Sequence, residues 1–378
     1  MLTSEQRVLV ACCGPSEQIT ERLTEAFGRS IDWRQVIDHC DAQGTLPLLS
    51  RALYLAHSIP VPEEFLTEIH EAATRKRLRS LGMAGELARI MRNMDTVHLT
   101  PITFKGPTLA YLAYGDVALR DSTDLDIYVP RRQLATALEL LSSDGYARKS
   151  PGFKTSLPGA CEVALQRQNP KFEVDLHWFF SSPYFLQLDG DRAISRSRMV
   201  QASGLVARTL CTEDLLTYLC IHAARECWAI RSICDLAGLL RNQPIDWNDL
   251  LREARQSHSW RAVAVGLRLA ATILEAPVPL EIWREVEREP VVRTIADQLA
   301  DNLSRDISDY AGAPGGAMLH LKMLESLAAK TDYLWRRALQ PSHLDADFIR
   351  LPDSLAPAYY LIRPFRVAYR ALGRLRPH

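Results

Sequence analysis

The stretch STDLDIYV, residues 122–129, alternates acidic and apolar residues before it ends in hydrophobic ones. This period of two predicts a β-strand with Leu125 and Ile127 on one face and Asp124 and Asp126 on the other. Two neighbouring carboxylates repel each other unless a cation or a proton lies between them. A solvated strand at a sheet edge could also tolerate the pair, so a metal site and an exposed edge are both open at this point.

Composition restricts the class of protein. The 378 residues are enough for one large core or for two to three packed units. Hydrophobic residues make up 47% and charged residues 24% of the chain, which is ordinary for a soluble globular protein. Lys plus Arg and Asp plus Glu both number 45, so no overall charge attracts nucleic acid or a membrane. An anionic ligand must therefore meet a local basic cluster.

The N-terminus and the cysteines favour a cytoplasmic protein. Residues 1–7 lack the pattern of a signal peptide, and no apolar run approaches the roughly 20 residues that span a bilayer. The eight cysteines include no C-x-x-C pair, which argues against a zinc knuckle and against a disulfide framework. Cys220, Cys227 and Cys234 are two helical turns apart, so we expect them to pack as small hydrophobic residues.

Helical patterns dominate both ends of the chain, and a block of strands lies between them. We predict strands over residues 99–106, 122–129, 146–149, 161–168 and 172–180. We predict helices over 16–27, 33–39, 45–56, 63–94, 107–115, 131–144, 212–241 (divided near 228–231), 247–256, 259–274, 280–287 and 291–307. The fold class is therefore α+β, with an N-terminal helical region at 1–60, a core at 61–185 and a C-terminal helical region at 186–378.

The C-terminal pattern AYYLIRPFRVAYRALGRLRPH is amphipathic and basic. Such a helix can lie on a membrane or on nucleic acid. More often its arginines form a solvated face over a packed helix, and we favour that interpretation. The arginines concerned are Arg363, Arg366, Arg370, Arg374 and Arg376.

A second acidic strand strengthens the case for a metal site. The stretch FEVDLHW, residues 172–178, places Glu173, Asp175 and His177 on a single strand face. If this strand lies beside the first, Asp175 approaches Asp124 and Asp126. Three converging carboxylates repel one another when empty but suit one or two Mg²⁺ or Mn²⁺ ions. Such ions can activate an attacking oxygen and neutralise the phosphates of a nucleotide.

Lys105 and Gly106 stand at a predicted strand-to-helix turn. A glycine permits close approach of the backbone, and the start of the following helix offers free amides to an anion. Lys105 and Arg120 could add positive charge near a triphosphate. An acidic pair and a Lys-Gly turn are each common by chance, whereas their order and surroundings together are more specific.

The stretches FKGPTLAYLAYGDVALRDSTDLDIYV (104–129), GY (145–146) and FEVDLHW (172–178) resemble the uncharacterised bacterial nucleotidyltransferase family of the polymerase-beta-type nucleotidyltransferase superfamily. The resemblance extends to LLTYLCIHAAREC (215–227), SICDLAGLLRNQPIDW (232–247) and LPDSLAPAYYLIRPFR (351–366). It implies a nucleotidyltransferase core with a small mixed sheet, a nucleoside triphosphate (NTP) substrate and a divalent metal. It also implies that Asp124 and Asp126 bind the metal and that Asp175 is the third carboxylate.

On the same resemblance, Gly106 is the glycine of the nucleotide-binding turn. The superfamily usually continues this turn with Gly or Ser, whereas Pro107 has neither an amide hydrogen nor a hydroxyl group. We expect Lys105 and Arg120 to take the place of the missing group.

Three further residues could face the substrate. His222 and Arg225 lie within one helical turn and point the same way. The resembling family also has a His at this place, which suggests a helical wall beside the cleft, and the alternative is a buried polar network between helices. His177 could orient Asp175 or could be a core histidine with satisfied hydrogen bonds.

The leading hypothesis is an enzyme that transfers a nucleotidyl group, with AMP preferred, from an NTP to an acceptor. The alternative is a catalytically inactive or regulatory module of the same fold that binds a nucleotide. The three carboxylates count against this alternative, because an inactive site has no need for a cluster that is costly to keep. The sequence leaves the acceptor open among a small molecule, a peptide and an RNA.

Overall fold

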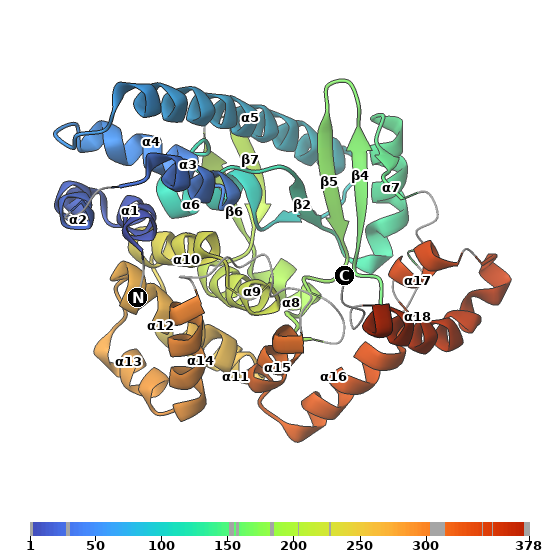
Figure 1. The fold of residues 1–378 in the computed structure, drawn as a ribbon. Helices are drawn as coiled ribbons and strands as arrows, with labels where there is room; N and C mark the ends of the chain where they lie inside the picture. Colours follow the sequence, from blue (N-terminus) through green and yellow to red (C-terminus); the bar gives the residue numbers. More distant parts are fainter. Residues whose placement is uncertain are drawn as a thin grey trace.

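A computed structural model describes residues 3–27, 31–150, 155, 159–181, 185–202, 204–226, 228–302, 314–341, 343–349 and 351–373. It confirms the α+β class, with helices at both ends of the chain and one sheet between them (Figure 1). The helices are α1 (Ser4–Cys12), α2 (Ile19–Ala26), α3 (Trp33–Ala42), α4 (Leu46–Leu55), α5 (Glu63–Thr96), α6 (Gly106–Tyr114), α7 (Leu134–Ser143), α8 (Gly190–Arg196), α9 (Thr212–Arg225), α10 (Ile230–Asn242), α11 (Trp247–Gln256), α12 (Trp260–Leu274), α13 (Leu280–Glu287), α14 (Pro290–Asn302), α15 (Pro314–Met323), α16 (Leu327–Leu339), α17 (His343–Phe348) and α18 (Tyr359–Gly373), with 3₁₀ turns at Ser16–Gln18, Arg131–Gln133 and Asp353–Ala358.

The sheet is mixed, as predicted. Its strands follow the order β3-β4-β5-β2-β1-β7-β6. The pairs β2–β5 and β1–β7 are parallel, whereas β1–β2, β3–β4, β4–β5 and β6–β7 are antiparallel. The strands are β1 (Ile102–Thr103), β2 (Leu125–Tyr128), β3 (Ala147–Arg148), β4 (Glu162–Arg167), β5 (Phe172–His177), β6 (Arg198–Ala202) and β7 (Leu205–Thr209).

Strands β6 and β7 were not predicted, and they extend the sheet beyond residue 185. Their residues lie in the range 186–378, for which the sequence analysis predicts only helices. The overlooked signal is the Ser-Gly pair between them, since a two-residue Gly-containing turn between alternating runs is typical of a hairpin. Gly204 takes the left-handed φ of +83° that such a turn requires.

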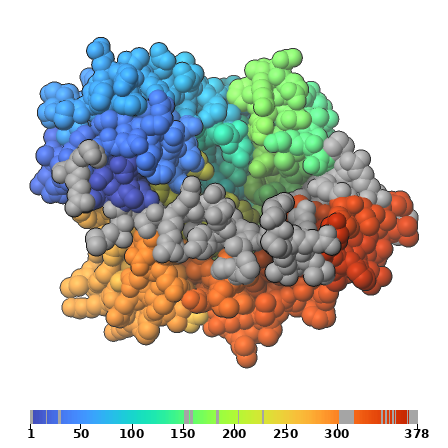
Figure 2. Space-filling model, in the orientation of Figure 1, coloured from blue at the N-terminus to red at the C-terminus, as the bar shows by residue number. Residues whose placement is uncertain are grey.

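The sheet separates two hydrophobic clusters. The apolar face of β2 and β5 packs with Leu87 and Met91 of α5 in one buried cluster, together with residues of α7. Tyr128, on the opposite face of β2, packs with Phe180 and Tyr218 in the larger cluster. Figure 1 shows α5 above the sheet and helices α9 to α16 below it, and the space-filling view shows the same division between the N-terminal and C-terminal helices (Figure 2). The acidic face of β2 therefore points toward the helices of the C-terminal half.

The basic C-terminal helix corrects one prediction. Arg363 and Arg366 do not form a solvated face, because both are buried and both form ion pairs with Asp345 of α17. The ion-pair distance from Arg363 Nη1 to Asp345 Oδ2 is 3.1 Å. These two arginines thus join α17 to α18. Arg374 and Arg376 lie outside the described residues, as does Cys227, whereas Cys220 and Cys234 are buried in the core as predicted.

No helix among the described residues is long and apolar enough to cross a membrane.

A close contact joins α6 to α10. A Cβ atom added to Gly238 would lie 2.6 Å from the backbone oxygen of Ala113, so α10 approaches α6 at a point where no side chain fits. Asn242 Nδ2 donates a 2.8 Å hydrogen bond to that same oxygen. Gln243 Nε2 donates a 2.9 Å hydrogen bond to Leu112 O. The end of α10 therefore satisfies carbonyl groups that the end of α6 leaves open.

This contact predicts opposite effects for two glycine substitutions. Gly238→Ala should lower the free energy of unfolding by about 1–3 kcal/mol, because the backbone of α6 must move to admit the methyl group. Gly82→Ala on α5 is the matched control, since its Cβ would meet nothing within 4 Å. The control should raise stability by up to about 1 kcal/mol through helix propensity. Urea unfolding measures both, and a loss in the control equal to that in Gly238→Ala would contradict the packing argument.

Candidate functional site

The two acidic strands are parallel neighbours in the sheet, as the site prediction required. Asp126 on β2 and Asp175 on β5 are paired residues in the strand register. Side chains of paired residues in adjacent strands point to the same face of a sheet, so the two carboxylates share one face. Asp124 lies two residues before Asp126, just ahead of β2. Asp126 is buried, whereas Asp124 and Asp175 are half-buried.

Two cationic side chains contact Asp126. Its Oδ1 lies 3.4 Å from Lys105 Nζ and 3.2 Å from His177 Nε2. The other ring nitrogen of His177 lies 3.0 Å from Glu162 Oε2 on β4. Burial would lower the pKa of His177, but the carboxylates of Glu162 and Asp126 raise it to about 9, so the imidazole is charged at neutral pH. His177 thus bridges two carboxylates and is not a metal ligand in this arrangement.

The three predicted metal-binding carboxylates are not equivalent. Burial alone would raise the pKa of Asp126, but Lys105 and then His177 hold it well below the ordinary range. The pKa of Asp175 is raised to about 6 by burial and by the negative charge of Asp126 and Asp124. Burial and Asp126 also raise the pKa of Asp124. Two of the three carboxylates therefore lack enough positive charge around them.

The donor set suits a hard divalent cation, although the side chains do not enclose one. Carboxylate oxygens are the ligands that Mg²⁺ and Mn²⁺ prefer, and the raised pKa values of Asp124 and Asp175 indicate uncompensated negative charge. Within the described part of the chain, however, no three His, Cys, Asp or Glu side chains are placed to hold one metal ion together. Lys105 and His177 occupy the oxygen of Asp126 on which such a site would depend.

The turn at Gly106 has the predicted geometry. Gly106 is the first residue of α6 and takes a φ of +58°, which L-residues with side chains rarely adopt. The nearest atom to a Cβ added there would be the backbone oxygen of Asp124, at 3.8 Å. The turn therefore lies beside the start of β2. It directs Lys105, the residue before it, to Asp126.

Arg120 is held in a buried ion pair. Its Nε donates a 2.9 Å hydrogen bond to Asp235 Oδ2 on α10, and its Nη1 donates a 3.3 Å hydrogen bond to Ser122 Oγ. Tyr114 at the end of α6 donates its hydroxyl to the other oxygen of Asp235, at 2.8 Å. The ion pair thus connects α6, α10 and the loop that leads to Asp124. A direct contact of Arg120 with phosphate stays a prediction.

The buried pair predicts a large stability effect at Asp235. Asp235→Asn should lower the free energy of unfolding by about 3 kcal/mol, because it leaves the Arg120 guanidinium buried without its counter-ion. Asp332→Asn is the matched control, since Asp332 forms an exposed pair with Arg336 on α16 at 2.7 Å. Its loss should cost less than about 1 kcal/mol. Equal losses in the two variants, measured by chemical denaturation, would contradict this account of Arg120.

Helix α9 lies beside Lys105, and a contact of its His222 and Arg225 with a substrate stays a prediction. Tyr218 packs edge-to-face on Phe104 at 4.7 Å between ring centroids, and its ring lies 5.8 Å from Lys105 Nζ. His222 stacks on Tyr218 at 5.8 Å. Burial and the charge of Lys105 lower the pKa of His222 to about 4, so its imidazole is neutral at pH 7. Lys105 and His222 thus both lie next to the ring of Tyr218.

His222 and Arg225 also form the polar network that we gave as the alternative. Glu226 accepts contacts from both, at 3.0 Å from His222 Nε2 and 3.2 Å from Arg225 Nη2. The two interpretations are compatible, because the same helix turn both borders the site and pairs its own side chains.

Three residues near the site were not singled out in the sequence. Glu162 is the register partner of His177 on β4, and the alternation of CEVALQRQ could have placed it on the acidic face. Tyr218 could have been found from its spacing of one helical turn before His222. Arg231 on α10 lowers the pKa of Asp124, and no local pattern brings these two residues together.

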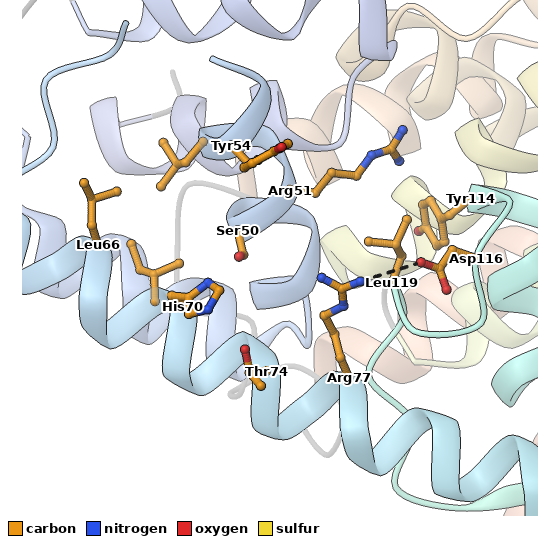
Figure 3. Close-up of a pocket in the computed structure, with 12 residues that line it drawn as sticks. Ser50, Arg51, Tyr54, Leu66, His70, Thr74, Arg77, Tyr114, Asp116 and Leu119 are labelled. Atoms are coloured by element: carbon orange, nitrogen blue, oxygen red, sulfur yellow. Dashed lines mark ion pairs between the residues drawn. The ribbon is translucent and has the colours of Figure 1, made fainter. Parts of the chain in front are cut away.

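A separate cavity of about 700 Å³ lies between α4 and α5 and the end of α6 (Figure 3). Leu53, Leu66 and Ile69 give it an apolar side, and an ion pair of Arg77 with Asp116 crosses the other side. Of the residues described above for the site, only Tyr114 lines this cavity. Its hydroxyl donates the hydrogen bond to Asp235. None of the predicted site residues faces this cavity.

A mixed sheet with paired acids on two parallel strands, next to a glycine turn and a helix start, is the arrangement expected of a nucleotidyltransferase core. The sequence profile of the uncharacterised nucleotidyltransferase family matches residues 29–275, and this range includes all seven strands and every predicted site residue. The chain therefore belongs to the uncharacterised nucleotidyltransferase family. No curated protein matched the chain in a sequence comparison.

Proposed function

We propose that this protein transfers a nucleotidyl group, with AMP preferred, from an NTP to an acceptor in a reaction that depends on a divalent metal. The proposal includes membership of the polymerase-beta-type superfamily. Its main support is the in-register pairing of Asp126 with Asp175 on parallel strands, next to Asp124 and the Gly106 turn. The match to a nucleotidyltransferase family adds to this support.

Asp124, Asp126 and Asp175 would hold the Mg²⁺ or Mn²⁺ ion. When bound, the ion would neutralise phosphate charge and lower the pKa of the attacking acceptor group. In the transfer, an acceptor oxygen or nitrogen forms a bond to the α-phosphorus, the bond between the α-phosphorus and the bridging oxygen breaks, and pyrophosphate leaves. Asp175 would accept the proton that the acceptor loses.

Lys105 and Gly106 would bind the triphosphate. Lys105 supplies a charge close to Asp126, at 3.4 Å, and can move to a phosphate oxygen when an ion takes its place. The backbone amides at the start of α6 supply hydrogen bonds, which Gly106 permits by its left-handed φ. Arg120 would act at longer range, from its pair with Asp235.

The acceptor would lie against α9. His222 and Arg225 are on the face of α9 near Lys105, and His177 lies on the strand next to the acids. Arg225 can donate hydrogen bonds to an acceptor, whereas His177 and His222 would first have to give up their carboxylate contacts. This chemistry does not separate a small molecule from a peptide or an RNA.

The alternative is a nucleotide-binding or regulatory module without transfer activity. One observation favours it, namely that Lys105 and His177 both contact the same oxygen of Asp126. Cationic side chains in that position can replace a metal ion and leave a site that binds but does not react. Metal dependence and the effect of acid substitutions distinguish the two functions.

The first test concerns metal dependence. ATP should bind only when Mg²⁺ or Mn²⁺ is present, because the uncompensated carboxylates of Asp124 and Asp175 repel a triphosphate. Calorimetry with the metal and with EDTA measures this difference. Binding of equal affinity in EDTA would contradict the metal-dependent enzyme and favour the alternative module.

The second test separates catalysis from folding. Asp175→Asn should reduce transfer of label from α-labelled ATP to lysate fractions by about a hundredfold to a thousandfold, because charge at the reaction centre is lost. Its melting temperature in EDTA should equal or exceed that of the wild type, because burial and two neighbouring carboxylates already disfavour the charge of Asp175. Asp126→Asn should also abolish transfer but should lower the melting temperature, since Lys105 and His177 lose their partner.

Glu173→Gln is the matched control for this second test. Glu173 lies two residues before Asp175 on the same strand and pairs with Lys149 at 2.7 Å. The substitution removes the same charge from the same strand face, and transfer should fall by less than about threefold, as expected for an exposed pair. Transfer at the wild-type level in Asp175→Asn would contradict the proposed function.

A further inference from the structure

Three cationic side chains lie near the Gly106 turn and the loop that leads to Asp124. Lys105 is next to Gly106, Arg120 donates a hydrogen bond to Ser122, and Arg231 lies against Gly44 close to Asp121. Lys105 precedes the turn before α6, Arg120 follows α6, and Arg231 is the second residue of α10. Basic groups from three separate segments therefore lie beside the turn and the loop that hold Asp124.

Two of these cations already have carboxylate partners. Lys105 contacts Asp126 at 3.4 Å, and Arg120 contacts Asp235 at 2.9 Å. The side chain of Arg231 forms neither an ion pair nor a hydrogen bond within the described part of the chain. It is half-buried, and an arginine removed from water in this way normally has an anionic partner.

The neighbours of Arg231 make its position unfavourable without an anion. The like charge of Arg120 and then burial lower the pKa of Arg231. Asp235 and Asp124 oppose this effect from a distance, but Asp235 is engaged by Arg120 and by Tyr114. Asp235 thus pairs with Arg120 and not with Arg231, and a phosphate group would supply the negative charge that Arg231 lacks.

The turn between α3 and α4 confines the head of Arg231. A Cβ added to Gly44 would lie 2.9 Å from Arg231 Nη1 and 3.6 Å from the Cβ of Asp121. Gly44 also takes a φ of +65°, so both the turn and the space for the guanidinium favour glycine. The shape of the surroundings, rather than a hydrogen-bond partner, therefore limits where the guanidinium can lie.

We propose that Arg231 binds the triphosphate of the NTP and donates the hydrogen bonds that Pro107, which has no amide hydrogen, cannot donate. This inference rests on the proposed function. A guanidinium group can donate two parallel hydrogen bonds to phosphate oxygens, which neither the Pro107 backbone nor a lysine can do. Arg231 is thus a substrate-binding residue from α10, a helix outside the strands that carry the acids.

The experiment compares binding of ATP, inorganic tripolyphosphate and AMP by calorimetry in Mg²⁺. Arg231→Gln should weaken ATP and tripolyphosphate by about tenfold or more, as expected when a charged hydrogen-bond donor to phosphate is lost. AMP should change by less than about threefold, because it lacks the distal phosphates. Arg231→Lys keeps the charge and should restore part of the lost affinity. Arg336→Gln on α16 removes the same charge from an exposed pair and should leave all three affinities unchanged.

The outcomes distinguish this inference from the proposed function. Equal ATP binding by the wild type and Arg231→Gln would overturn the inference and leave the function standing. Absence of any ATP binding by the wild type would overturn both. Removing Arg231 also relieves repulsion with Arg120, so the melting temperature of Arg231→Gln should equal or exceed that of the wild type. A marked fall in melting temperature, or failure of this variant to fold, would show a structural role and would overturn the inference.

Discussion

The burial of the Asp126 carboxylate is the constraint on which the site depends. A carboxylate that is only 5% exposed must have cationic or hydrogen-bonding partners. The chain supplies them from two directions, Lys105 from the turn before α6 and His177 from β5. The turn requires the left-handed backbone of Gly106, and the histidine requires the parallel register of β2 with β5. The backbone conformation at Gly106 and the register of β2 with β5 therefore each place one cationic side chain next to Asp126 Oδ1.

This arrangement divides the acids of the site into two kinds. Asp126 takes both nearby cations, and Glu162 binds His177 from the opposite side. Asp124 and Asp175 are left with burial and mutual repulsion, which raise the pKa of each. An incoming divalent cation would relieve that repulsion but would compete with Lys105 for Asp126. The electrostatic balance among these groups, rather than the number of acids, would decide whether the site binds a metal ion.

The parts that the sequence predicted are those with a local pattern. Alternation placed Asp126 and Asp175 on strand faces, and the helix-forming composition of residues 63–94, which contain no Pro, predicted α5, observed as Glu63–Thr96. The unpredicted parts depend on contacts between distant segments. The sequence around Arg363 does not predict that it is buried against Asp345. Arg120 and its partner Asp235 are separated by 115 residues in the chain. Such partners belong to the tertiary packing and leave no periodic signal.

A packing contact away from the acids determines which arginine can meet a ligand. Gly238 lets α10 approach α6 so closely that Asp235 reaches both Tyr114 and Arg120. Tyr114 and Arg120 each donate to one oxygen of Asp235, whereas the Arg231 side chain, one turn earlier in the helix, forms no ion pair with it in the described part of the chain. The absence of a side chain at residue 238 thus allows the contacts of Asp235 with Tyr114 and Arg120, which leave Arg231 without a carboxylate partner in the described part of the chain.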